Sequence, residues 1–323
     1  MSVPFLLAPM AEVSHRALRE LIEDFGGCDQ YFTEMISAAP LINGGPFESW
    51  YTDAGPCPER VVYQIAGANP DRLTAAARLL DRNVCAGIDV NMGCSAPGIA
   101  RAGAGVAWMA SIDKARALIG RLRKQTRRRL SVKLRIGFED NFDYLAAFCT
   151  SLSAEGVDFI TLHPRTAKEK FKRKARWDYV SRLRAVLSIP VAGNGDIAGS
   201  EELVRRASGE CDAVMIGRLA VRSPWVFAEA RAIETARPVP ADIDLESLGF
   251  RFLDLLGRHQ PPEFHTSRAH RFFSYFCDNL TWSTWLKTSL YRETGLSAMS
   301  EVWRAYFRDH PEERRLRRKV PVL

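Results

Sequence analysis

The sequence predicts an α/β protein, a (β/α)8 TIM barrel followed by a C-terminal all-helical domain. Three observations lead to this prediction. The 323 residues are close to the length of one such barrel, about 250 residues, plus a small second domain. Short strand-like runs alternate with amphipathic stretches as far as residue 218, and only helical patterns follow residue 240. We therefore expect the barrel over residues 1–240 and the helical domain over residues 241–323.

Eight runs rich in β-branched and aromatic residues are the expected strands. They cover residues 5–10, 30–35, 60–67, 87–93, 130–137, 159–165, 189–196 and 213–218. Helices fill the gaps, and three of them follow clear start signals, which are Asn69 before 72–80, Ser111 before 114–124 and Ser200 before 203–207. An open doubly wound sheet is the alternative, but no G-x-G-x-x-G follows the first strand. Eight strands in strict alternation favour the closed barrel.

The tail after residue 240 is helical in pattern over residues 245–257, 267–279 and 299–307. Aromatic residues recur there at helical spacing, with basic residues between them. Such a stripe packs a small helical domain more often than it stacks on bases, so we expect most of these rings to be core.

The composition is typical of a folded protein, and its positive net charge favours an anionic partner. Hydrophobic residues make up 46% of the chain, and the formal net charge is +7. The N-terminus lacks a signal-peptide pattern and no run of about 18 apolar residues occurs, so we expect a cytoplasmic protein without a membrane segment. Seven irregularly spaced cysteines without a C-x-x-C pair predict reduced thiols and no metal site. We expect a monomer.

Two basic clusters fall on opposite faces of the expected barrel. Residues 165–176 hold seven basic residues against Glu169 alone, and they leave the carboxyl end of the sixth strand. Active sites of such barrels lie at that end, so this cluster suits a polyanionic substrate. Residues 121–129 hold six basic residues between a helix and the next strand, and we expect a solvated face there.

Cys94 is the most informative single residue. It ends the segment Asn91-Met92-Gly93-Cys94, which comes directly after the buried-strand run 87–90. A thiol at that place faces a ligand. Lys133 lies within a strand, where an inward ammonium is costly unless it meets an anion or an acceptor. Two glycine-rich turns, at residues 193–196 and 217–218, come where barrels of this type bind phosphate.

From about residue 5 to residue 228 the chain resembles the tRNA-dihydrouridine synthases. The motifs that carry the resemblance recur in order. They are Ala8-Pro9-Met10-Ala11 with residues 14–19, Thr33-Glu34-Met35-Ile36-Ser37-Ala38, Gln64-Ile65-Ala66-Gly67, residues 89–94, residues 132–137, His163-Pro164-Arg165-Thr166, and the turns Asn194-Gly195-Asp196 and Gly217-Arg218.

The resemblance implies an FMN-binding barrel, a helical tRNA-binding domain and two sets of site residues. The residues implied for FMN are Pro9, Met10, Ala11, Gln64, Lys133, His163, Asn194, Gly195, Asp196, Gly217 and Arg218. The residues predicted for the tRNA substrate are Glu34, Asn91 and Arg165, which lie in the motifs above, and the basic-cluster residues Lys168, Lys172, Arg173 and Lys174.

The same resemblance implies the reaction. NADPH, or NADH, reduces FMN, which passes a hydride to C6 of a uracil in tRNA, while Cys94 supplies the proton at C5. A cysteine thiol suits that task because it is ordinarily protonated at neutral pH. Lys133 would stabilise the anionic reduced flavin. The alternatives are an FMN-dependent barrel oxidoreductase acting on a free pyrimidine or enone, and a non-catalytic tRNA-binding protein.

Three positions depart from the family pattern. Cys94 is followed by Ser95-Ala96-Pro97 in place of an immediate Pro, which leaves the shape of the catalytic loop open. Pro164 replaces the usual Gly between His163 and Arg165. Residues 171–174, Phe-Lys-Arg-Lys, replace a glycine-rich region, so we expect unusual RNA contacts there.

Overall fold

The computed structural model describes residues 2–239 and 242–316. Eight of its strands form a closed parallel barrel, because β1 pairs with both β2 and β9. A short additional strand, β3, continues the pairing with β4 where β2 has ended. The strands are β1 (Phe5–Leu7), β2 (Gln30–Phe32), β3 (Ile36–Ser37), β4 (Val61–Ala66), β5 (Gly87–Met92), β6 (Arg129–Gly137), β7 (Phe159–Thr166), β8 (Val191–Asn194) and β9 (Ala213–Ile216). The expected barrel is confirmed, and all eight expected strands are found.

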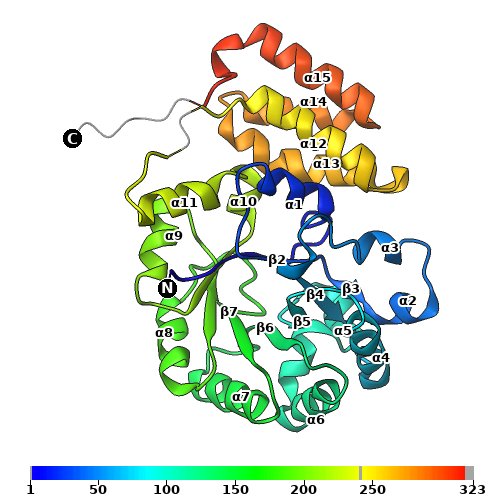
Figure 1. Cartoon of the computed structure of the whole chain (residues 1–323), viewed down its shortest axis with the longest axis vertical. Coiled ribbons are helices and arrows are strands. Elements are labelled where there is room, and N and C mark those ends of the chain that lie inside the picture. The colour runs from blue at the N-terminus through cyan, green and yellow to red at the C-terminus, as the bar shows by residue number, and fades with distance from the viewer. Residues whose placement is uncertain (1, 240–241, 317–323) are drawn as a thin grey trace. The chain divides into compact units, whose positions relative to one another are not determined.

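Helices connect the strands, as Figure 1 shows. Asn69 and Ser111 cap their helices as expected, since Asn69 Oδ1 accepts from Arg72 N at 3.0 Å and Ser111 Oγ from Lys114 N at 3.3 Å. The helices up to β9 are α1 (Arg16–Glu23), α2 (Ala38–Asn43), α3 (Glu48–Tyr51), α4 (Pro70–Leu80), α5 (Pro97–Arg101), α6 (Ile112–Arg123), α7 (Phe142–Ala154), α8 (Trp177–Val186) and α9 (Ser200–Ala207), with 3-10 turns at Pro58–Arg60 and Gly105–Ala110.

The barrel interior is packed. One buried cluster draws side chains from six strands or their ends, and it comprises Leu6, Ala8, Phe32, Val62, Phe159, Ala192, Ala213 and Met215. A filled interior means that a ligand is bound at a barrel end and not inside a pore.

The basic residues before β6 and at its first position correct one expectation. Arg123 Nη1 donates to Asp158 Oδ2 at 2.8 Å, and Arg128 Nη1 donates to the Cys85 carbonyl at 3.0 Å. Arg129 lies over the Phe159 ring at 4.8 Å. All three arginines are half-buried, so the prediction of a merely solvated face is wrong for them. Their guanidinium groups tie together loops at the amino ends of the strands.

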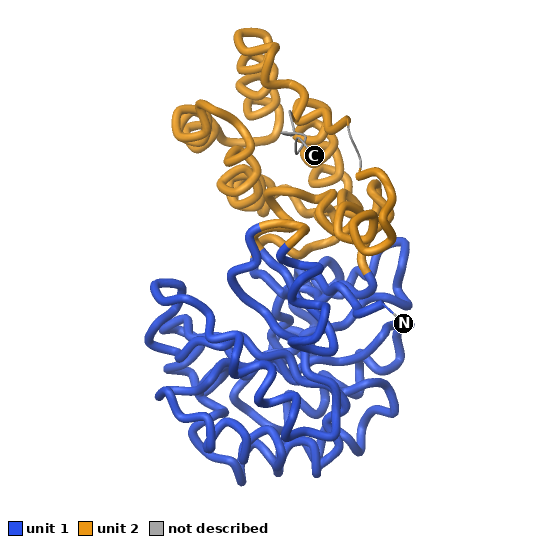
Figure 2. Tube along the Cα trace, turned by 90° about the vertical axis from the view of Figure 1, so that its left-hand side faces the viewer, with its two compact units in different colours: residues 1–11, 29–198, 202–217 blue, residues 12–28, 199–201, 218–323 orange. Residues whose placement is uncertain are grey.

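The chain divides into two compact units, coloured in Figure 2. The first holds residues up to 11, 29–198 and 202–217, and the second holds residues 12–28, 199–201 and those from 218 onward. The boundary expected between residues 240 and 241 falls outside the described residues. The second unit includes α1, an early segment of the chain that packs against α12.

The second unit has an aromatic core, as expected. The Phe252 and Phe272 rings stack with centroids 3.7 Å apart, and Trp303 is fully buried beside Phe273. Its later helices are α10 (Arg218–Arg222), α11 (Val226–Glu234), α12 (Leu245–His259), α13 (Pro262–Phe276), α14 (Ser283–Arg292) and α15 (Leu296–Asp309), with 3-10 turns at Cys277–Asn279 and Pro311–Glu313. The three expected helices are found, and α14 was missed. Nowhere in the described ranges is a helix long and apolar enough to span a bilayer.

Candidate active site

Polar side chains from adjacent strands meet at the carboxyl end of the barrel. Asn91 on β5 pairs in register with Lys133 on β6, and Arg135 pairs with His163 on β7. Lys133 Nζ donates to Asn194 Oδ1 at 3.0 Å, which joins β6 to β8. The amide of Asn194 in turn donates to a carbonyl of β9 at 2.8 Å. Four of the predicted site residues therefore lie at one edge of the sheet.

Cys94 lies two residues beyond β5, half-buried, in a turn that is held on both sides. Its N–H donates to Asn91 Oδ1 at 2.9 Å, and its carbonyl accepts from Val106 N at 3.0 Å. Gly105 has φ +60°, and a Cβ there would lie 2.5 Å from the Cys94 carbonyl oxygen. None of the seven cysteines forms a disulfide in the structure.

Three buried side chains form an amide relay behind Cys94, comprising Asp89, Gln64 and Asn91. Asn91 Nδ2 donates to Gln64 Oε1 at 2.9 Å, and Gln64 Nε2 donates to Asp89 Oδ2 at 2.7 Å. The other oxygen of Asp89 accepts from Ser131 Oγ at 2.6 Å. Burial raises the pKa of Asp89 to about 6, against the opposing effect of these hydrogen bonds. Sequence reasoning missed Asp89, although a carboxylate inside an apolar strand was a visible signal.

Lys133 combines burial with a neighbouring cation. Desolvation, and after it the charge of Arg135, lowers the pKa of Lys133 to about 8. Arg135 Nε donates to the Gly93 carbonyl at 3.1 Å, so this second cation lies beside the Cys94 turn. An ammonium held in this setting gains by meeting an anion or a hydrogen-bond acceptor.

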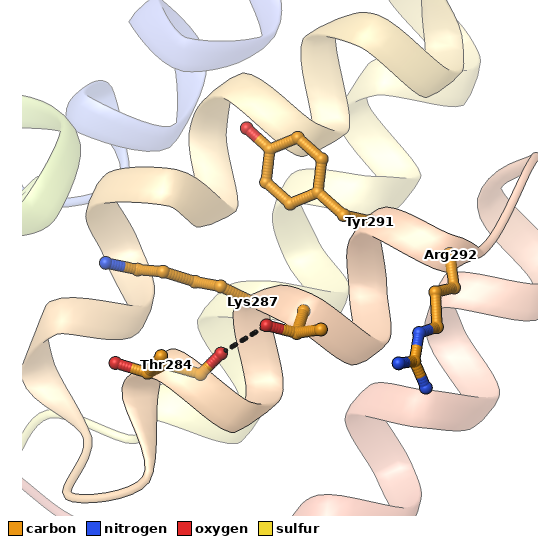
Figure 3. Close-up of a pocket in the computed structure, with 5 residues that line it drawn as sticks. Thr284, Lys287, Tyr291 and Arg292 are labelled. Atoms are coloured by element: carbon orange, nitrogen blue, oxygen red, sulfur yellow. Dashed lines mark hydrogen bonds between the residues drawn. The ribbon is translucent and has the colours of Figure 1, made fainter.

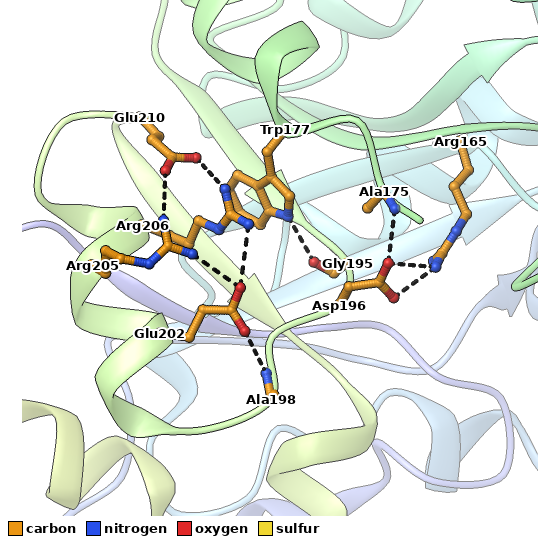
Figure 4. A network of polar contacts seen from close by, with 10 residues as sticks. All are labelled: Arg165, Ala175, Trp177, Gly195, Asp196, Ala198, Glu202, Arg205, Arg206 and Glu210. Atoms are coloured by element: carbon orange, nitrogen blue, oxygen red, sulfur yellow. Dashed lines mark hydrogen bonds and ion pairs between the residues drawn. The ribbon is translucent and has the colours of Figure 1, made fainter. Parts of the chain in front are cut away.

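Arg165 and Asp196 form a closed ion pair (Figure 4). Arg165 Nη2 lies 2.6 Å from both carboxylate oxygens of Asp196, and Ala175 N donates to the same carboxylate at 2.8 Å. Arg165 Nη1 lies 3.0 Å from His163 Nε2. Since a guanidinium can only donate, His163 Nε2 accepts and the ring is neutral. Arg165 is 2% exposed, so the predicted contact between this residue and a base has no open surface here.

The glycine turn after β8 rests on Trp177. Trp177 Nε1 donates to the Gly195 carbonyl at 2.9 Å, and a Cβ at Gly193 would lie 2.2 Å from the indole ring. Gly195 has φ +121° and Asp196 has φ +53°, both left-handed. Figure 4 shows the indole between this turn and Arg206, whose guanidinium carbon lies 4.5 Å from the ring centroid. The turn is thus fixed by side chains around it.

The predicted FMN residues fall into two groups. Gln64 and His163 are buried, with 0% and 6% exposure. Others retain accessible surface, namely Pro9, Met10, Ala11, Lys133, Asn194, Gly195, Asp196, Gly217 and Arg218. A Cβ at Gly217 would lie 2.9 Å from Met10 Sδ, so the turn after β9 passes close to the turn after β1. Glu34, predicted for the substrate, is 4% exposed beyond β2.

The basic loop after β7 has an anchored base and an exposed tip. Arg176 binds Glu169 with a 2.5 Å contact and also lies 3.1 Å from Asp140. The exposed cations of the loop are Lys168, Lys170, Lys172, Arg173 and Lys174. Phe171, among them, is 59% exposed. The predicted RNA-binding cations of this loop therefore have solvent-facing side chains.

A pocket in the second unit lies on α14, and none of its lining residues is a predicted site residue. Figure 3 shows its lining, which consists of Thr284, Lys287, Thr288, Tyr291 and Arg292. Tyr291 stacks on His270 with ring centroids 4.5 Å apart, and Lys287 pairs with Asp278.

Solved structures similar to this chain share its fold. A variant of NCR from Zymomonas mobilis superposes with a TM-score of 0.51 at 14% identity, covering 82% of this chain and 94% of that one. Morphinone reductase in complex with tetrahydroNAD gives a TM-score of 0.50 at 10% identity, covering 73% of this chain and 88% of that one. At such low identity the likeness supports the barrel alone.

Sequence comparisons are more specific. A protein named probable tRNA-dihydrouridine synthase from Aquifex aeolicus is 34% identical over 258 residues, which cover 75% of this chain and 78% of that protein. One of the same name from Mycobacterium tuberculosis is 32% identical over 272 residues, covering 79% and 68%. The family model described as dihydrouridine synthase matches residues 6–275. The chain therefore belongs to the dihydrouridine synthase family.

Proposed function

We propose that this protein is a tRNA-dihydrouridine synthase, an oxidoreductase that reduces the C5–C6 double bond of uridines in tRNA. The observation that carries the proposal is the half-buried thiol of Cys94, held in a turn at the carboxyl end of the barrel beside Lys133. Family membership and relatives named probable tRNA-dihydrouridine synthases support the same reaction.

FMN is the cofactor that we assign, with NADPH or NADH as its reductant. The donor set fits a flavin, whose ring edge carries carbonyl oxygens and ring nitrogens, because the strand ends present an ammonium and amide groups with accessible surface. Pro9, Met10 and Ala11 would line the ring, and Lys133 would face its pyrimidine edge. The phosphate would be held by backbone N–H groups of residues 194–196 and 217 and by Arg218. The Asp196 carboxylate is engaged by Arg165, so Asp196 would contribute through its backbone.

Reduced FMN, when bound, supplies a hydride to C6 of the uracil. Cys94 supplies the other hydrogen, because its Sγ–H proton moves to C5 and leaves a thiolate. Lys133 is near enough to this sulfur for a charge on Cys94 to raise the pKa of Lys133. Water then returns a proton to Sγ. Asn91, 7% exposed, orients the turn and the base that enters beside it.

The exposed cations of the loop after β7 would bind phosphates of the RNA. These are Lys168, Lys172, Arg173 and Lys174, to which the structure adds Lys170. A uracil within a base stack cannot reach a thiol at a barrel end, so the target nucleotide must be turned out of the stack. Arg165 would act indirectly, by holding His163 neutral and Asp196 in place.

The experiment that tests this function is anaerobic flavin reoxidation. The purified protein is reduced with NADPH, and in parallel with NADH, and is then mixed with unmodified tRNA or with buffer. RNA-dependent return of the oxidised-flavin absorbance is expected, together with dihydrouridine in the recovered tRNA. A flavin that ignores tRNA but reacts with a free pyrimidine or enone would establish a small-molecule reductase. A protein without flavin that binds tRNA would be non-catalytic.

The matched variants are Cys94→Ala and Cys57→Ala, since both thiols are half-buried and outside disulfides; Cys57 Sγ accepts a hydrogen bond from Arg60 at 2.8 Å. Cys94→Ala should still bind flavin and accept electrons from NADPH, but form dihydrouridine at least about a hundredfold more slowly, as for loss of a general acid. Cys57→Ala should behave as wild type. Normal dihydrouridine formation by Cys94→Ala would remove Cys94 as the proton donor.

A further inference from the structure

We propose that Asp89 is a positioning residue, which fixes the turn that carries Cys94 through the amide relay of Gln64 and Asn91. The relay starts at the backbone of the turn, ends at a buried carboxylate, and runs through three hydrogen bonds of 2.9, 2.9 and 2.7 Å. The consequence of this role for proton transfer rests on the proposed function. The structural role of Asp89 does not depend on it.

The direction of every hydrogen bond in the relay is fixed from the Cys94 end. The N–H groups of Gly93 and Cys94 can only donate, so Asn91 must turn its oxygen toward them, at 3.3 and 2.9 Å. Its amide nitrogen then donates to Gln64 Oε1. The amide nitrogen of Gln64 in turn needs an acceptor, and Asp89 Oδ2 is that acceptor. If the Gln64 amide were flipped, its nitrogen would face the amide nitrogen of Asn91, and both groups can only donate.

Burial makes the relay respond as a unit. Gln64 and Asp89 are 0% exposed and Asn91 is 7% exposed, so bulk water does not reach the amides to replace a lost partner. Burial also raises the pKa of Asp89 to about 6, which means that its surroundings favour the ionised carboxylate less than water does. Stability of the strand alone therefore does not account for an acidic residue at this position.

The turn depends on the relay because its other restraints hold carbonyl groups and not the N–H of Cys94. The Cys94 carbonyl accepts from Val106 N at 3.0 Å, and the Gly93 carbonyl accepts from Arg135 Nε at 3.1 Å. Without Asp89 the amide of Gln64 loses its acceptor, Asn91 is free to rotate, and the N–H of Cys94 loses a fixed partner. The thiol would then sample several directions.

The test measures alkylation of Cys94 by iodoacetamide in the full-length protein as purified, with each site quantified by mass spectrometry. Asp89→Leu removes the acceptor at similar volume. Asp89→Asn keeps an oxygen for Gln64 and can donate its amide to Ser131 Oγ, so it preserves the relay. Ser131→Ala is the matched control, because it removes the hydrogen bond to the other oxygen of Asp89. Cys149, fully buried on α7, reports general unfolding.

Asp89→Leu should alkylate at Cys94 about fivefold faster than wild type, while Asp89→Asn and Ser131→Ala stay within about twofold and Cys149 does not change. Equal Cys94 rates in Asp89→Leu and wild type would overturn the proposal, as would parallel increases at Cys94 and Cys149. If Asp89→Leu does not fold, Gln64→Leu breaks the same relay in its middle and carries the same expectation. Alkylation requires no turnover, so this result stands apart from the flavin and tRNA assay.

Discussion

The position of the Cys94 thiol depends on a glycine as much as on the relay. Gly105 combines a φ of +60° with a Cβ position only 2.5 Å from the Cys94 carbonyl oxygen. Gly105→Ala would have to push the turn away and strain its own backbone, at a cost of about 2–4 kcal/mol. We expect a lower free energy of unfolding by urea titration and slower dihydrouridine formation.

Gly98 is the matched control for this prediction. It lies on α5, between Cys94 and Gly105 in the chain, nothing lies within 4 Å of its Cβ position, and its backbone is ordinary. Gly98→Ala should therefore leave both measurements near wild type, within about 0.5 kcal/mol for stability. If both alanine variants lost the same stability, the close approach at Gly105 would not be the cause.

His15 makes the stability of the second unit sensitive to acid. It is 3% exposed, and neither ring nitrogen has a hydrogen-bond partner among the described residues. Burial, and then the charges of Arg268 and Arg19, hold the pKa of His15 well below its usual value. The folded protein keeps this ring neutral, whereas the unfolded chain binds a proton below about pH 6.5. Stability is therefore lost as the pH falls through that value, by up to about 1.4 kcal/mol per unit.

The measurement is the free energy of unfolding in urea at pH 7.5 and pH 5.0, for wild type and His15→Gln. The glutamine does not titrate, so the loss between the two pH values should be smaller in the variant. His310→Gln, at the end of α15, serves as the control and should keep the wild-type loss. An unchanged loss in His15→Gln would show that other groups carry the acid sensitivity.

At the scale of elements, alternation and turn chemistry were enough to predict the barrel strands and the caps at Asn69 and Ser111. The sequence did not predict α14, because only Leu286 and Leu290 of that helix are buried and its periodicity is weak. The expected strand at 30–35 ends at Phe32, and the short strand β3 begins only at Ile36. Such details depend on tertiary contacts that adjacent residues do not encode.

The same limit applied to the site. The prediction placed both Lys133 and Asn194 among the FMN residues, and the structure joins them by a hydrogen bond. Arg165 and Asp196 are 31 residues apart, and their pairing depends on β7 and β8 being neighbours with a particular turn after each. In the sequence, an isolated charged residue suggests a contact with a ligand. Only the folded structure shows that such a residue pairs with a distant side chain.

The loop after β7 gives a prediction for a whole element. Glu169 accepts hydrogen bonds from Thr166 N and from Arg176, each at 2.8 Å, and Arg176 is the main reason why its pKa is lowered to about 2. Glu169→Gln removes the charge and weakens the base of the loop. Opening should become easier by about 1 kcal/mol, so trypsin should cut between residues 168 and 174 about fivefold faster. Asp178→Asn, which affects an exposed pair at 4.0 Å, should leave the cleavage rate unchanged. Equal rates in the two variants would contradict the anchoring role.

At the scale of the whole molecule, the segment 12–28 belongs to the second unit although it lies between β1 and β2 in the chain. Leu18, Leu21 and Ile22 on α1 are fully buried, and α1 packs against α12. Polar contacts join the same parts, since Arg251 pairs with Asp24 at 2.9 Å. A truncated chain that ends before α12 therefore keeps α1, which lies between β1 and β2 in the sequence, but loses the helix against which α1 packs.

We accordingly expect that truncation after residue 239 gives an unstable or aggregated protein and not a free-standing barrel. Exposing the apolar face of α1 should raise the fluorescence of a hydrophobic dye and lower the midpoint of thermal unfolding relative to the full chain. Loss of dihydrouridine formation in this truncation would then say nothing about RNA binding. The double variant Lys172→Ala with Lys174→Ala provides the cleaner test of RNA binding. Removal of these two exposed cations should weaken tRNA binding and reduce its salt dependence without changing the unfolding midpoint. A monodisperse truncated protein that unfolds at the temperature of the full chain would show that α1 does not need α12.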